Sequence, residues 1–208
     1  MGSTGRVYFR YTLPNSDMSR ISLLALLDDY AIRHPEEAAV IQRFVDFVEA
    51  YEHCFERDLW AGHVTGSAWL LDAARERVLL THHRKLGRWL QLGGHSDGDP
   101  EPMRVAIREA EEESGLEVAP LSRRIFDLDI HEIPARRHDP AHYHFDVRFA
   151  LQVAGSEDYG VSDESLDLAW VPVTELHRYT DEASMLRMAR KWLSDPLSRV
   201  SDSLPGWS

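Results

Sequence analysis

The sequence predicts an α/β (α+β) protein in which a mixed sheet is flanked by helices and preceded by a helical hairpin. Three observations support this fold class. Apolar residues recur at helical spacing from Met18 to about Asp58, the pattern changes to short strand-like runs after Gly62, and two further helical segments interrupt those runs. Strands interleaved with helices are typical of a layered domain with the sheet between the helices.

The first segment is expected to be the hairpin. Its two apolar stripes are separated by Pro35, and Glu36 and Glu37 follow this proline. A proline followed by acids is typical of the first turn of a helix, because proline has no amide proton to lose there and acids favour the positive end of the helix dipole. We expect the hairpin to pack on the main domain or on a second subunit, which would make a homodimer. The stripes contain Leu23, Leu24, Leu27 and Ala31, then Val40, Phe44, Phe47, Val48 and Tyr51.

The main domain follows with strands predicted at 64–71, 77–83, 88–92, 123–133, 142–153 and 166–173. One helix is predicted from about 102 to 114, where Gly115 is a usual stop signal, and another from about 182 to 193. The expected organisation is therefore an N-terminal extension at 1–17, the hairpin at 18–58, a catalytic domain at 59–195 and a C-terminal tail at 196–208.

Composition restricts the function. The 208 residues are 43% hydrophobic and 28% charged, which is enough for a core of their own. There is no run of about 18 uncharged apolar residues and no apolar secretion signal, so we expect no membrane association. The single cysteine, Cys54, excludes an internal disulfide and a zinc ribbon, which fits a cytoplasmic protein.

The chain is acidic, and the acidity is local. It carries 35 Asp and Glu against 23 Lys and Arg, a net charge of −12, which disfavours nucleic acid as a partner. Residues 97–117 alone contain eight acids and two bases. An acidic cluster this local meets a cation or repels itself.

The stretch from Gly93 to Val118 is a glycine loop that leads into the helix carrying Glu109, Glu112 and Glu113. These are positions i, i+3 and i+4, so the three carboxylates share one helical face and would lie within a few ångströms of each other. Oxygen ligands without cysteine select Mg²⁺ or Mn²⁺. The alternative is a solvated acidic helix face, which is the commoner origin of a charge run.

This stretch resembles the Nudix box, G-x5-E-x7-R-E-U-x-E-E-x-G-U, where U is aliphatic. The glutamate expected after G-x5 is replaced by Pro100, which lies between Asp99 and Glu101. The segment at 162–176 also resembles the late strand of that family. The matching positions of the box are Gly94, Arg108, Glu109, Glu112, Glu113, Gly115 and Leu116, with Ala110 as a small U residue.

The resemblance implies a Nudix-like α/β/α sandwich and hydrolysis of a nucleoside diphosphate linked to another moiety, with Mg²⁺ or Mn²⁺. It makes Glu109, Glu112 and Glu113 metal ligands, with the Gly93 carbonyl as a further ligand. Arg108 would orient the glutamates. Glu164, in the loop before the late strand, is a candidate general base or a solvated loop acid. The rival function is a non-catalytic Nudix-like nucleotide-binding or regulatory module.

Three residues beyond the box are candidates for substrate binding. His95 follows the glycine pair and could approach phosphates or make a local hydrogen bond. Arg88 belongs to the one basic stretch before the glycine loop, which could attract an anion or form a solvated turn. Arg148 lies in an alternating strand whose polar row could face solvent, line the substrate cleft or form a His-X-His-X-Asp metal site. That row is His142, His144, Asp146 and Arg148, opposite Tyr143, Phe145, Val147 and Phe149.

Overall fold

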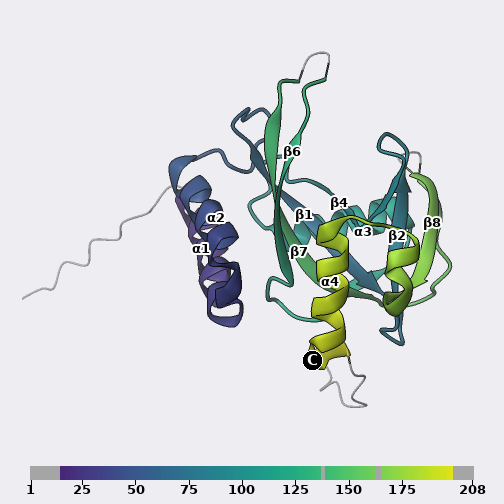
Figure 1. Cartoon of the computed structure of the whole chain (residues 1–208). Coiled ribbons are helices and arrows are strands. Elements are labelled where there is room, and N and C mark those ends of the chain that lie inside the picture. Colours follow the sequence, from purple (N-terminus) through teal and green to yellow (C-terminus); the bar gives the residue numbers. More distant parts are fainter. Residues whose placement is uncertain (1–14, 137–138, 163–164, 199–208) are drawn as a thin grey trace, which may run out of the picture.

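The computed structural model describes residues 15–136, 139–162 and 165–198, and their central element is a mixed eight-stranded sheet (Figure 1). Its strands are β1 His63–Leu71, β2 Arg77–His83, β3 Arg88–Leu90, β4 Leu92–His95, β5 Val118–Pro120, β6 Asp127–Ile133, β7 His142–Val153 and β8 Ser165–Pro172. The α-helices are α1 Asn15–Arg33, α2 Ala38–Ala50, α3 Pro102–Ser114 and α4 Ala183–Ser194, with 3-10 turns η1 Pro35–Glu37, η2 Val173–Arg178 and η3 Pro196–Ser198.

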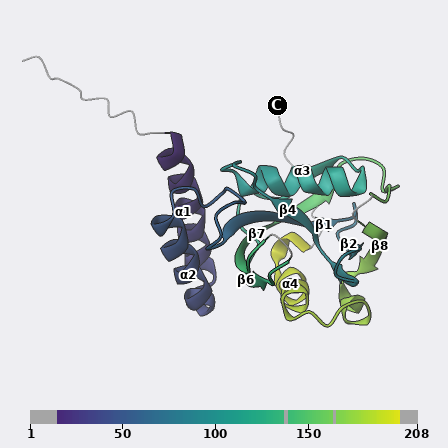
Figure 2. The same ribbon diagram turned by 90° about the horizontal axis from the view of Figure 1, so that it is seen from above.

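The sheet lies between α3 and α4, which confirms the α/β/α sandwich (Figure 2). The strand order is β3-β2-β1-β7-β5, with β4 also paired to β1, β6 to β7 and β8 to β2. Only the β1–β7 pair is parallel among these strand pairs. Val64 and Ala68 of β1 share a core with Ala106 of α3, whereas Trp69 packs with Met185 of α4. Alternate residues of one strand therefore serve the two layers.

The hairpin packs against its own chain at one end of the sandwich (Figures 1 and 2). Phe47 of α2 stacks on Phe145 of β7 with ring centroids 3.8 Å apart, and Phe44 meets the same ring edge-on at 5.3 Å. Pro35 begins a 3-10 turn instead of an α-helical turn, and α2 begins at Ala38. The helix α2 ends at Ala50, so the hairpin is shorter at its C-terminal end than predicted. Positions 1–14 and 199–208 of the expected extension and tail lie outside the described residues.

The predicted helix over 102–114 is present with those bounds. Gly115 adopts a left-handed φ of 70°, and its amide donates to the Glu111 carbonyl at 2.8 Å. The strand predicted at 88–92 is wrong as a single element. It divides at Gln91 into β3, which pairs with β2, and β4, which pairs with β1. The chain therefore changes strand partners immediately before the glycine pair.

The polar row of β7 does not face solvent, because Asp146 and Arg148 are each only 2% exposed. Arg148 Nε lies 2.7 Å from Asp146, and its Nη1 lies 3.1 Å from Asp127. We call the buried and partly buried set that includes these groups the inner ionic network. Its members are Asp127, Asp129, Asp146, Arg148, Arg187 and Lys191.

Tyr143, expected in the core, is 40% exposed. It pairs with Glu132 of β6 but precedes His144, where the pairing of β7 with β1 begins. The start of β7 therefore runs past the end of β1, and Tyr143 has less of the sheet to pack on.

No helix within residues 15–136, 139–162 and 165–198 combines the length and apolar character that a membrane crossing requires.

Candidate active site

The glycine strand β4 and the helix α3 are joined through Glu113. The side chain of Glu113 is only 9% exposed, and its Oε1 accepts a hydrogen bond from the Gly93 amide at 2.9 Å. A carboxylate that accepts a backbone amide is held in one orientation by a charge-assisted bond. Glu113 therefore fixes the last turns of α3 to the beginning of β4.

Glu109 lies over the next residue of the strand, Gly94. A Cβ atom at position 94 would lie 2.5 Å from the Glu109 carboxylate, so the glycine is needed for this close approach. Arg108 donates to Glu109 Oε1 at 2.9 Å and to the His95 carbonyl at 2.8 Å. One guanidinium thus links the glutamate to the strand, which is the contact that an orienting role requires.

The structure does not gather all three glutamates as closely as their helical spacing predicts. Glu112 is exposed, while Glu109 and Glu113 lie against successive glycines. Among the described residues, the groups of three or more ligand atoms within 4.8 Å of one another do not include this trio. The reason is that Arg108 and the Gly93 amide each hold one carboxylate. The donor set, carboxylates on one helix face beside the glycine strand, still fits a hard divalent cation such as Mg²⁺.

Asp99, the acid beside the departure at Pro100, has a local structural role. Its carboxylate contacts Arg104 at 2.7 and 2.5 Å and accepts the Glu101 amide at 2.9 Å. Burial would raise the pKa of Asp99, but the Arg104 hydrogen bonds outweigh it and the pKa is lowered. The acid next to Pro100 therefore stabilises the entry to α3.

The other predicted residues are spread over the fold. Arg148 belongs to the inner ionic network, where its guanidinium contacts three carboxylates. Arg88, in β3, contacts Glu182, the residue before α4. Glu164 lies outside the described residues. The roles of these three residues stay predictions.

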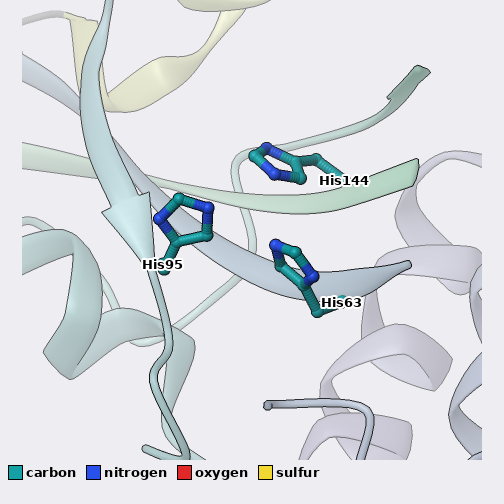
Figure 3. Close-up of side chains that lie close together, drawn as sticks. All are labelled: His63, His95 and His144. Carbon is teal, nitrogen blue, oxygen red and sulfur yellow. The ribbon is translucent and has the colours of Figure 1, made fainter. Parts of the chain in front are cut away.

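His95 lies beside histidines that belong to other strands (Figure 3). Its ring centroid is 5.1 Å from those of His63 in β1 and His144 in β7. Burial, and then the neighbouring histidines, lower the pKa of His63 to about 4 and that of His144 to about 2. Sequence reasoning missed His63, because only the parallel pairing of β1 with β7 places it opposite His144.

The comparisons with known proteins agree with this architecture. The NUDIX domain family matches residues 62–192. The solved Ap4A hydrolase of C. elegans, in a binary complex, is 17% identical with a TM-score of 0.51, and the match covers 63% of this chain and 95% of that one. A NUDIX-family hydrolase from Clostridium perfringens is 24% identical over 62% of this chain and 95% of its own, with a TM-score of 0.46.

A third structure, the dihydroneopterin triphosphate pyrophosphohydrolase of E. coli, is 17% identical over 62% of this chain and 92% of its own, with a TM-score of 0.48. No curated protein sequence matches the chain. The family match spans most of the chain, from the turn before β1 to the end of α4. The chain therefore belongs to the Nudix hydrolase family.

Proposed function

We propose that the protein is a pyrophosphohydrolase that uses Mg²⁺ or Mn²⁺ to hydrolyse a nucleoside diphosphate linked to another moiety. The observation that carries this proposal is the contact between α3 and β4. Glu113 is bound to the Gly93 amide, and Glu109 is held over Gly94 by Arg108. The two carboxylates are thereby fixed beside backbone that a cation can also approach.

Each site residue has a proposed role in metal binding or in hydrolysis. Glu109, Glu112 and Glu113 would hold the ion, with the Gly93 carbonyl as a further ligand, and Arg108 would keep Glu109 in place. The bound ion would offset the phosphate charge and acidify the attacking water. Water adds to a phosphorus, the bond to the bridging oxygen breaks, and the water's proton passes to a base. Glu164 is our candidate for that base.

Two basic side chains are the proposed substrate contacts on the described surface. Arg88 is exposed on β3, and His95 directly follows the glycine pair, although its side chain points to the opposite side of β4 from Glu109. Arg148 is our weakest candidate, because a guanidinium already bound by three carboxylates has little capacity for a phosphate. We place the protein in the cytoplasm because its single cysteine, Cys54, is buried and forms no disulfide.

A panel assay tests the proposed activity. Nucleotide sugars, ADP-ribose, dinucleotides and nucleoside triphosphates are incubated with Mg²⁺ or Mn²⁺, and product release is compared between the native protein and Glu113→Gln. We expect turnover of at least one class, reduced about 100-fold or more in the variant, since even outer partners of a metal site are worth 10- to 100-fold. Glu111→Gln is the matched control on the same helix and should retain turnover.

The rival binding module gives a different result. If no compound is turned over while a nucleotide with metal still raises the melting temperature, the protein binds without hydrolysing and the proposal is wrong.

A homodimer is a separate proposal, which analytical ultracentrifugation of the full chain tests. The hairpin packs on its own sheet, so a dimer would have to use another surface or the outer face of α1 and α2.

A further inference from the structure

Three histidines from three different strands point toward one another (Figure 3). His63 opens β1, His95 ends β4 and His144 lies in β7. One ligand nitrogen or more from each ring falls within 4.8 Å of the others. Gly94 faces Glu109 on the α3 side, so the His95 side chain, one residue later in the strand, lies on the opposite side. This histidine cluster is therefore separate from the α3 glutamates.

The cluster contains buried nitrogen atoms without hydrogen-bond partners. His63 is 2% exposed, and neither its Nδ1 nor its Nε2 has a partner. The Nε2 atom of His144 is in the same condition. An unsatisfied buried polar atom is costly, so the three in these two neighbouring rings call for an explanation. A cation that accepts one lone pair from each ring would give one nitrogen of each histidine a partner.

The protonation state favours a cation over an anion. Burial lowers the pKa of His63, with further lowering by His95 and His142, while the nearby Leu59 carbonyl, which lies outside hydrogen-bonding geometry, acts in the opposite direction. The pKa of His144 is lowered by burial and by four neighbouring histidines. At neutral pH these two rings are uncharged, which is the form that binds a metal. An imidazolium site for phosphate would need the opposite shift.

We propose that His63, His95 and His144 bind one divalent transition-metal ion of the Zn²⁺ class. Imidazole nitrogen suits zinc, whereas Mg²⁺ and Mn²⁺ prefer oxygen. Tetrahedral bonds of about 2.0–2.1 Å place ligand nitrogens roughly 3.3 Å apart, which small rotations of rings already within 4.8 Å can reach. Three protein ligands leave the fourth position for water or another small ligand. This site does not depend on the proposed hydrolysis.

Metal retention by the full chain tests the site. The protein is dialysed against Zn²⁺ in a large excess of Mg²⁺, free ions are removed, and bound zinc is measured by elemental mass spectrometry. We expect one zinc per chain in the native protein. His95→Gln and His144→Gln should bind zinc at least about 10-fold more weakly, because losing a ligand costs no less than losing its supporting partner. His177→Gln, an exposed histidine of η2, is the control.

Two further measurements keep the outcome clear if a buried variant fails to fold. Co²⁺ added to the native protein should give the strong visible bands of a tetrahedral nitrogen site. NMR of the imidazole nitrogens should show zinc-induced shifts for His63 and His144. The proposal is overturned if no zinc is retained above Mg²⁺, or if Glu109→Gln abolishes zinc binding while the histidine variants keep it.

Discussion

The molecule holds two groups of carboxylates with opposite surroundings. In the inner ionic network, Asp127 receives hydrogen bonds or ion pairs from Arg148, Arg187 and Lys191. Beside β4, the described contacts of the α3 glutamates include one cation, Arg108. Asp127 is fully buried, whereas Glu112 is exposed.

The difference shows how a fold separates structural acids from acids that are available for chemistry. Burial alone would raise the pKa of Asp127, but the Arg187 hydrogen bond and the neighbouring cations lower it. Its charge is therefore compensated inside the protein. The α3 glutamates lie on the helix face beside the glycine strand, where a bound cation would offset their mutual repulsion. The first group should therefore control stability, and the second should control activity.

The largest expected effect is on the inner ionic network. Asp127→Asn leaves Lys191 and Arg187 without their shared carboxylate, and removing one partner of a buried ion pair costs about 3–5 kcal/mol. Urea unfolding followed by circular dichroism measures the loss. Glu112→Gln is the comparison, and its free energy of unfolding should change by less than about 0.5 kcal/mol. Equal losses in both variants would remove the distinction between the two groups.

Metal binding should stabilise the protein through the α3 glutamates. Mg²⁺ or Mn²⁺ at about 100 times its dissociation constant should raise the free energy of unfolding by about 2.7 kcal/mol. The increase should be much smaller in Glu109→Gln and unchanged in Glu111→Gln. Thermal melting with and without the ion measures it, and an identical increase in Glu109→Gln would place the ion elsewhere.

Gly94→Ala should reduce activity with little change in stability. The added Cβ would lie 2.5 Å from the end of the Glu109 side chain, which can move away at small cost and so leaves its position. We expect metal affinity and turnover to fall about 10- to 100-fold. Gly155→Ala is the control, because a Cβ there meets nothing closer than 3.9 Å. Unchanged turnover in Gly94→Ala would show that the position of Glu109 is not critical.

The smallest expected effect is on the stability that Asp129 contributes at acidic pH. Burial raises the pKa of Asp129, but the His131 hydrogen bond and Arg148 outweigh it, so the folded-state pKa is lowered. The stabilisation from Asp129 is therefore complete above the unfolded-state pKa of about 4 and is lost as the pH falls below it, at up to about 1.4 kcal/mol per pH unit. Asp129→Asn should flatten this decline in urea unfolding between neutral and acidic pH. A decline as steep as that of the native protein would assign it to other groups.

Periodicity predicted the elements where one side of a segment is apolar. The helix α3 and the strands β2 and β7 have the predicted bounds, and the helix predicted at about 182 to 193 is α4, with Met185 and Trp192 buried. The resemblance of Gly93 to Val118 to the Nudix box indicated the family, which the family match over residues 62–192 confirms. The divergence of Glu109, Glu112 and Glu113 was not predictable, because it depends on which of them meets Arg108 or the Gly93 amide.

Other features depend on partners that are distant in sequence. An alternating strand gives the same pattern whether its polar row meets water or buried charges, so the environment of Arg148 required Asp127 and Arg187 to be placed first. The histidine cluster likewise depends on the register that puts His63 opposite His144. The break between β3 and β4 was missed because residues 88–92 read as one continuous strand. Nothing in that pattern marks Gln91 as the point where the two strands separate.

The contacts of Lys191 with Tyr30 and Glu37 connect the two ends of the described chain, since Lys191 and Tyr30 are 161 positions apart. At about 5–20 residues per second, ribosomal synthesis makes the hairpin wait on the order of 10–30 s for this partner. Leu27 and Phe44 share their core with Phe145 and Val147 of β7, so their apolar side chains also wait for that strand. The nascent hairpin therefore exposes apolar side chains until β7 has been synthesised, and chains that stop before β7 should be prone to aggregation.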